Sequence, residues 1–134
     1  MNKMLVIDDE PEIIELFKRT FELEEIEVIA AYNGDQALHQ MSEYLFNIVI
    51  TDIRLPDTDG KILIPQLKEI NPLVNIVVIT GYSSMENVVG CLGGGAVDYF
   101  TKPFKDMDLI IATVKALFEK VKRWKKAVIL KQKS

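Results

Sequence analysis

Short apolar runs rich in Val and Ile alternate along the chain with longer amphipathic stretches. The apolar runs predict strands at residues 4–7, 27–31, 48–51, 75–80 and 97–101. The amphipathic stretches predict helices at residues 11–24, 35–43, 61–70, 84–92 and from 106 onward. Strict alternation of strand and helix indicates a single α/β domain, in which a parallel sheet is covered by helices on both faces.

Proline and glycine refine these boundaries. Pro11 suits the first turn of its helix, where the missing N–H costs nothing. Pro65 lies inside the third helical stretch and predicts that this helix starts late or kinks. Glycines crowd residues 88–95, and each costs a helix about 1 kcal/mol relative to alanine. The fourth helix is therefore expected to be loose or to end early.

Length and composition indicate one domain with a core of its own, because the chain has 134 residues of which 49% are hydrophobic. Cys91 is the single cysteine and cannot form an internal disulfide. The N-terminus lacks the pattern of a secretion signal, and no apolar run is long enough to cross a bilayer. These features predict a soluble, cytoplasmic protein without a membrane segment.

Charge divides the chain into an acidic body and a basic tail. All 20 acidic residues lie within residues 1–119, whereas the last 15 residues carry seven of the 16 Lys and Arg residues and no acid. The acidic balance of residues 1–119 argues against direct nucleic-acid binding by the globular part. Residues 120–134 are better interpreted as a separate helical element.

Carboxylates and other polar residues stand where the predicted strands end. Asp8 and Asp9 follow the first strand, Asp52 the third, Thr80 closes the fourth, and Lys102 follows the fifth. In a sheet of strand order 2-1-3-4-5, ligands bind at the carboxyl ends of strands one and three, where the chain order reverses. This order predicts that the five side chains converge on one edge of the sheet.

Residue chemistry indicates what such an edge could hold. Three neighbouring carboxylates repel one another unless a cation neutralises them, and Mg²⁺ prefers such oxygen ligands. Lys102 and Thr80 suit a phosphoryl oxygen instead. Asp52 could then act as a nucleophile toward phosphorus and form an acyl phosphate.

Structural interpretations of the same acids stay open from the residues alone. Asp8 and Asp9 could cap the helix that starts near Pro11, and Asp52 could cap a turn. Asp57 and Asp59 resemble turn residues more than ligands.

The motifs in order are Asp8-Asp9-Glu10-Pro11, Thr51-Asp52-Ile53-Arg54-Leu55-Pro56 followed by Asp59-Gly60, Thr80-Gly81, and Gly95-Ala96-Val97-Asp98-Tyr99-Phe100-Thr101-Lys102-Pro103-Phe104. Together they resemble the receiver domains of two-component response regulators, over about residues 1–119. The resemblance implies a flavodoxin-like (βα)₅ fold with strand order 2-1-3-4-5. It also implies a phosphorylation-dependent signalling switch that catalyses only its own aspartyl phosphorylation and dephosphorylation.

The resemblance assigns roles to individual residues. Asp52 would accept the phosphoryl group from a histidine kinase or phosphotransfer protein. Asp9, Asp52 and the backbone carbonyl of Arg54 would ligate Mg²⁺, with Asp8 contributing, often through water. The Lys102–Pro103 peptide bond would be cis.

The family's switch maps onto two further residues. Thr80 would move toward the phosphoryl group, and Tyr99 would turn into the space that Thr80 vacates. The surface formed by the fourth helix, fifth strand and fifth helix would then change its partner preference.

A heptad-like seam follows the fifth helix into the tail, through Ile110, Val114, Leu117, Val121, Trp124 and Val128. The members up to about Val121 are expected to pack on the sheet. Trp124 and Val128 have no domain core to cover. They predict a dimerisation helix, or a linker to an output domain absent from this chain.

Two other classes of function compete with a signalling switch. A metal-dependent phosphohydrolase with an Asp nucleophile would need a second acid where Arg54 stands. A flavodoxin-like cofactor binder would need apolar or aromatic walls and phosphate-binding Ser, Thr and Gly in place of the acids.

Overall fold

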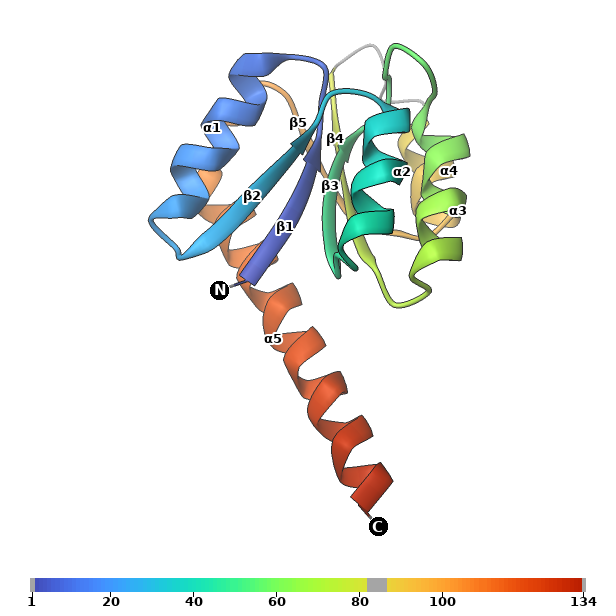
Figure 1. Cartoon of the computed structure of the whole chain (residues 1–134). Helices are drawn as coiled ribbons and strands as arrows, with labels where there is room; N and C mark the ends of the chain where they lie inside the picture. Colours follow the sequence, from blue (N-terminus) through green and yellow to red (C-terminus); the bar gives the residue numbers. More distant parts are fainter. Residues whose placement is uncertain (1, 82–86, 134) are drawn as a thin grey trace.

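A computed structural model describes residues 2–81 and 87–133, with side chains described as far as Val128. The strands are β1 (Asn2–Ile7), β2 (Ile26–Ala31), β3 (Ile48–Asp52), β4 (Asn75–Thr80) and β5 (Ala96–Thr101). The helices are α1 (Pro11–Glu22), α2 (Gly34–Glu43), α3 (Gly60–Ile70), α4 (Val88–Gly93) and α5 (Met107–Lys133). Every predicted strand and helix is present (Figure 1).

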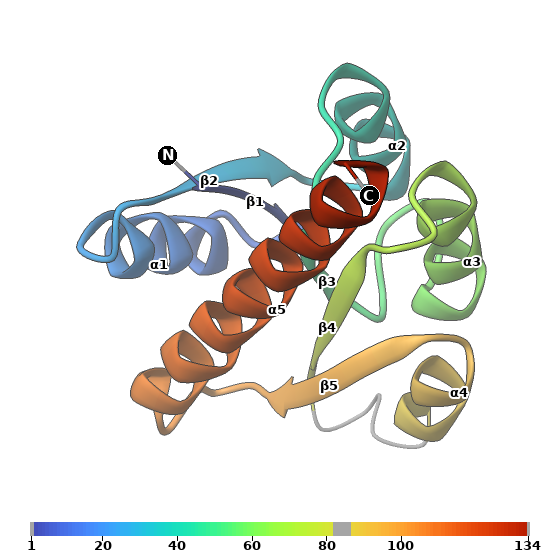
Figure 2. The ribbon, with the colours of Figure 1, turned by 90° about the horizontal axis from the view of Figure 1, so that it is seen from below.

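The strands form one parallel sheet in the order β2-β1-β3-β4-β5, so the predicted fold class and strand order are confirmed. Helices α1 and α5 cover one face, and α2, α3 and α4 cover the other (Figure 2). Each face has its own hydrophobic cluster, because alternate residues of a strand point to opposite sides. In β1, Leu5 and Ile7 join the cluster under α2 and α3, whereas Met4 and Val6 join the one under α1 and α5.

Side-chain caps determine where two of the helices begin. Asn33 caps α2 through a side-chain oxygen that accepts from Gln36 N–H, and Asp59 caps α3 by accepting from Lys61 and Ile62 N–H. The capped α3 begins at Gly60 and runs through Pro65, whose side chain is exposed. The expectation of a late start was wrong, and the cap at Asp59 stabilises this first turn by about 1 kcal/mol. A kink at Pro65 stays a prediction.

Helix α4 is short, with six residues from Val88 to Gly93. Residues 84–86 of the predicted helix lie outside the described residues. The helix does not end early, since it passes the predicted limit by one residue before Gly95 takes a φ of 119°, and its looseness stays a prediction. Cys91 of α4 points into the core, with 1% of its surface exposed, and burial raises the pKa of its thiol.

Helix α5 continues far past the sheet, as the seam predicted (Figure 1). Val121 is buried against the α1 and α5 face, whereas Trp124 and Val128 are 39% and 54% exposed. The domain core therefore ends at Val121. Among the helices described, α5 included, we find none with the length and apolar content needed to span a bilayer.

Candidate phosphoacceptor and metal site

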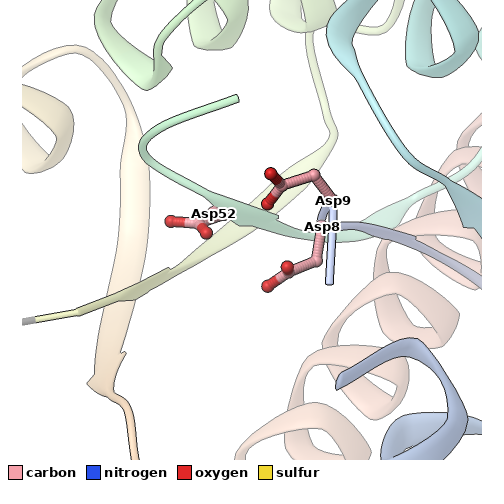
Figure 3. A group of neighbouring side chains, drawn as sticks. All are labelled: Asp8, Asp9 and Asp52. Carbon is pink, nitrogen blue, oxygen red and sulfur yellow. The ribbon is translucent and has the colours of Figure 1, made fainter. Parts of the chain in front are cut away.

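Three carboxylates gather at the adjacent carboxyl ends of β1 and β3 (Figure 3). Asp52 is the last residue of β3, and Asp8 and Asp9 follow β1 directly. Because β1 and β3 are parallel neighbours, their ends open on the same edge of the sheet. One oxygen from each carboxylate lies within 4.8 Å of the others. The predicted convergence of these three acids is present in the structure.

Asp8 is the most buried of the three, with no exposed surface. Its Oδ1 accepts a hydrogen bond of 2.9 Å from Glu10 N–H. Within the described residues its Oδ2 has no partner in ordinary hydrogen-bond geometry, although Lys102 Nζ lies 2.7 Å away as an ion pair. Burial raises the pKa of Asp8, and Lys102 opposes that rise. Asp8 thus keeps acceptor capacity for a further cation.

The alternative interpretation of Asp8 and Asp9 as helix caps is wrong. Glu10 occupies the N-cap position of α1, and its side chain makes no capping hydrogen bond. The side chain of Asp8 instead bonds the N–H of Glu10. Pro11 occupies the first turn of α1 as predicted.

Lys102 Nζ links the acids by ion pairs with Asp8 Oδ2 at 2.7 Å, Glu10 Oε2 at 2.8 Å and Asp52 Oδ2 at 3.0 Å. Only 15% of its side chain is exposed. Burial disfavours the charged ammonium, but the surrounding carboxylates of Asp8, Glu10 and Asp52 outweigh that effect and raise the pKa of Lys102. The lysine is therefore a permanent cation beside Asp52.

Glu10 was missed as a site residue by sequence reasoning. Its side chain is 48% exposed, and it lies 92 residues from Lys102 in the chain. Its position directly after two acids was the available signal. With Glu10 included, three carboxylates pair with one ammonium group and Asp9 lies beside two of them, so the edge keeps a surplus of negative charge.

The loop after β3 is fastened at several points. Arg54 N–H donates to Asp52 Oδ1 at 3.3 Å, so the backbone of Arg54 lies at the site. Arg54 also forms an isolated antiparallel bridge with Asp59, and Gly60 N–H donates to Ile53 O at 2.7 Å. The loop thus closes on itself between Asp52 and the start of α3.

Asp57 ties the same loop to a different helix. Its two carboxylate oxygens accept from Gly34 N–H at 2.8 Å and Asp35 N–H at 2.9 Å, in the first turn of α2. The hydrogen bond from Gly34 is the largest cause of a lowered pKa for Asp57. Asp57 and Asp59 are therefore capping residues, in keeping with their turn-like interpretation. No local signal revealed the partner of Asp57, because Gly34 lies 23 residues away.

Thr80, Tyr99 and Pro103 complete the predicted set. Thr80 is buried, its hydroxyl donates to Gly81 O at 3.0 Å, and its carbonyl accepts from Lys102 N–H at 2.8 Å. Thr80 is thus joined to the site through the backbone of Lys102. Tyr99 is 38% exposed on β5, and the Lys102–Pro103 peptide bond is cis, the isomer that the resemblance implies.

The donor set suits a hard divalent cation. Asp8, Asp9 and Asp52 offer carboxylate oxygens alone, which Mg²⁺ prefers over nitrogen or sulfur. The buried Asp8 Oδ2 and the exposed Asp9 supply both a shielded and an accessible ligand. The residues present therefore fit Mg²⁺.

Comparison with known proteins gives a consistent family. Residues 4–115 match the response regulator receiver domain. The transcriptional regulatory protein ZraR of Escherichia coli K12 is 34% identical over 111 residues, which cover 83% of this chain and 25% of ZraR. The response regulator GtcR of Aneurinibacillus migulanus is 36% identical over 107 residues, covering 80% of this chain and 44% of GtcR.

Solved structures of receiver domains have the same fold over most of this chain. A receiver domain protein from Methanospirillum hungatei matches with a TM-score of 0.81 at 32% identity, covering 92% of this chain and 98% of that one. The beryllofluoride-activated NtrC4 receiver domain dimer matches with a TM-score of 0.82 at 31% identity, covering 90% of this chain and 98% of that one.

The chain spans about a quarter of the length of ZraR and of the regulatory protein AtoC. The shared part is the response regulator receiver domain, a signalling module. The match covers most of the chain, the strand order is that of the fold, and the acids lie at the expected edge. The chain belongs to the response regulator receiver domain family.

Proposed function

We propose that this chain is a phosphorylation switch in which Asp52 accepts a phosphoryl group from a histidine kinase or phosphotransfer protein. The observation that carries the proposal is the ion pair of 3.0 Å between Asp52 Oδ2 and Lys102 Nζ, beside the carboxylates of Asp8 and Asp9. Asp52 is 8% exposed, so it combines a fixed position with access from one side. A carboxylate so placed is a nucleophile for in-line phosphoryl transfer.

In the transfer step a carboxylate oxygen of Asp52 forms a bond to phosphorus. The phosphorus–nitrogen bond of a phosphohistidine donor breaks, and its electron pair stays on the imidazole. Lys102 neutralises charge on the phosphoryl oxygens throughout, because its ammonium remains protonated among the acids. The N–H of Arg54, which donates to Asp52 Oδ1, orients the carboxylate for attack.

Asp8, Asp9, Asp52 and the backbone carbonyl of Arg54 are the proposed ligands of Mg²⁺. The bound cation would neutralise the acids and polarise the phosphoryl group. The surplus of carboxylates over ammonium groups at this edge supports that assignment. Without a cation the same carboxylates repel an incoming anionic donor.

Thr80 and Tyr99 are the proposed readout. Thr80 is buried at the end of β4, the strand beside β3, and its carbonyl accepts from Lys102 N–H, so it lies close to the strand ends that carry Asp52 and Lys102. Tyr99 is partly exposed on the neighbouring strand β5. A movement of Thr80 would change the α4, β5 and α5 face and with it partner binding or dimerisation. Thr80→Ala is expected to leave phosphorylation intact and to weaken its effect on partner binding.

Intact mass spectrometry after incubation with acetyl phosphate and Mg²⁺ tests the proposal. We expect one phosphoryl adduct on the chain, none on Asp52→Asn, and none when EDTA replaces Mg²⁺. Asp108→Asn is the matched control, because Asp108 is an exposed carboxylate in the first turn of α5, and it should be phosphorylated like the parent chain. An adduct on Asp52→Asn equal to that of the parent would contradict Asp52 as the acceptor.

A further inference from the structure

An apolar hollow of about 310 Å³ lies where α5 leaves the sheet. Its apolar lining consists of Leu73 from the loop before β4 and of Val121, Trp124 and Val128 from α5. Asn47, which precedes β3, and Lys125 complete it. The hollow therefore lies at the amino ends of the strands, opposite the carboxylates. We call it the tail groove.

The tail groove presents large apolar side chains to solvent. Leu73 is 59% exposed, Trp124 39% and Val128 54%, whereas Val121 belongs to the core. Val121, Trp124 and Val128 are spaced three and four residues apart and so form one stripe along α5. Exposed apolar residues that line a concavity are typical of interaction surfaces.

Positive charge surrounds this stripe. A second hollow of about 340 Å³ shares Asn47, Val121 and Lys125 with the tail groove, and its other charged residues are Lys3, Lys122 and one acid, Glu119. Lys120 Nζ lies 4.9 Å from the centre of the Trp124 ring. The last 15 residues contain no acid to balance these lysines. The surface is thus apolar in the middle and basic at its margins.

We propose that the tail groove binds an amphipathic helix of a partner protein that carries acidic residues beside its apolar stripe. A stripe with helical spacing packs well against a second helix, and the hollow beside it accepts one of that helix's apolar side chains. Acidic flanks of the partner would pair with Lys120 and Lys125, which border the stripe on its two sides. The charge of the surface selects the partner class.

A second copy of the tail fits this surface poorly. If two α5 helices packed in parallel along Val121, Trp124 and Val128, Lys120 of one copy would face Lys125 of the other. In an antiparallel arrangement the lysines of the two tails would also lack acidic partners, because residues 120–134 contain no acid. A lipid surface also fits poorly, since Leu73 and Asn47 wall the hollow from the domain side and a flat bilayer does not fill a concavity.

The chain carries its own probe for this test, because Trp124 is its single tryptophan. Two synthetic helical peptides of about three heptads would be titrated into the full chain. Both have Leu at the core positions, and the flanking positions hold Glu in one and Lys in the other. We expect a saturable blue shift of Trp124 emission with the Glu peptide and at least roughly tenfold weaker binding of the Lys peptide. Added NaCl should weaken the Glu complex.

Variants locate the interaction. Leu73→Asp and Val128→Asp should each weaken binding of the Glu peptide by about tenfold or more, because each places a negative charge on the apolar lining of the groove, against the apolar side chains of the peptide. Leu23→Asp is the matched control, since Leu23 is 87% exposed after α1 and lies outside the groove. Circular dichroism confirms that each variant is folded. Asp52→Asn should bind the peptide normally, which separates this proposal from the phosphorylation switch.

Three outcomes would overturn the proposal. Equal affinity for the Glu and Lys peptides would remove the role of charge. A sedimenting dimer that Val128→Asp dissociates, with no peptide binding, would assign the groove to a second copy. A shift of Trp124 emission with phosphatidylserine vesicles and none with the Glu peptide would assign the surface to anionic lipid.

Discussion

The two edges of the sheet present opposite chemistry. At the carboxyl ends of the strands, Asp8 and Asp52 extend from strand termini and are held within a few ångströms of Lys102. At the amino ends, Lys122 and Lys125 extend from a helix that has left the sheet, and both are exposed. Short side chains on strand ends fix a geometry that suits a small ion or a phosphoryl group. Long side chains on a projecting helix suit a larger partner.

Lys102→Met should produce the largest effect and break the acidic edge. The change leaves Asp8 buried beside Asp52 with no ammonium group, so we expect the free energy of unfolding to fall by about 3 kcal/mol at neutral pH. Urea denaturation measures the loss, and Mg²⁺ should restore part of it by neutralising the same acids. Lys105→Met, in the exposed loop after β5, is the control and should change stability little. An equal loss in both variants would refute the neutralising role of Lys102.

Val121→Ala tests where the core ends along α5. Val121 is 7% exposed within the α1 and α5 cluster, so its truncation should cost about 1.5 kcal/mol. Val128→Ala removes the same atoms from a 54% exposed side chain and should cost less than about 0.5 kcal/mol. Thermal unfolding of the two variants gives the comparison. Similar losses would mean that the core extends into the tail groove.

Glu10→Gln sharpens the account of the acidic edge. Without the charge of Glu10, Lys102 forms ion pairs with Asp8 and Asp52 alone. The change also removes one negative charge from the approach of the anionic phosphoryl donor. We expect the rate of adduct formation with acetyl phosphate to rise about threefold, with the stability unchanged within about 0.5 kcal/mol. A time course of intact mass measures the rate. Glu12→Gln, exposed in the first turn of α1, is the matched control.

Asp57→Asn should produce the smallest effect. The hydrogen bonds from Gly34 and Asp35 hold the pKa of Asp57 below its ordinary value of about 3.9. The ionised group therefore contributes stability above that value, and the contribution disappears as the pH falls through the lowered pKa. We expect a loss of roughly 0.5 kcal/mol at pH 7 that vanishes in strong acid. A loss independent of pH would contradict this origin, and Glu15→Gln serves as the exposed control.

Sequence patterns predicted the features that depend on neighbouring residues or on strand ends. Asp8 and Asp52 could be placed together because each ends an apolar run and parallel strands open on one edge. The length of α5 followed from the spacing of Val121, Trp124 and Val128. These signals lie within a few residues or follow from topology.

Features that depend on distant partners escaped prediction. Nothing near Glu10 indicates that Lys102, 92 residues later, will bind its carboxylate. Asp57 was correctly interpreted as a turn residue, yet its hydrogen bonds to the first turn of α2 exist only in the folded chain. The start of α3 was misjudged because the penalty of Pro65 was weighed without the cap that Asp59 supplies.

The fastened loop after β3 has a thermodynamic consequence for cation binding. Its backbone is closed by Gly60 and Ile53, bridged between Arg54 and Asp59, and anchored to α2 by Asp57. The conformational entropy of this segment is therefore lost when the domain folds and not when a ligand arrives. A site preorganised in this way gives a cation its full binding energy without a disorder-to-order transition. Loosening the distant first turn of α2 should consequently lower the affinity of the proposed cation site, although none of its proposed ligands belongs to α2.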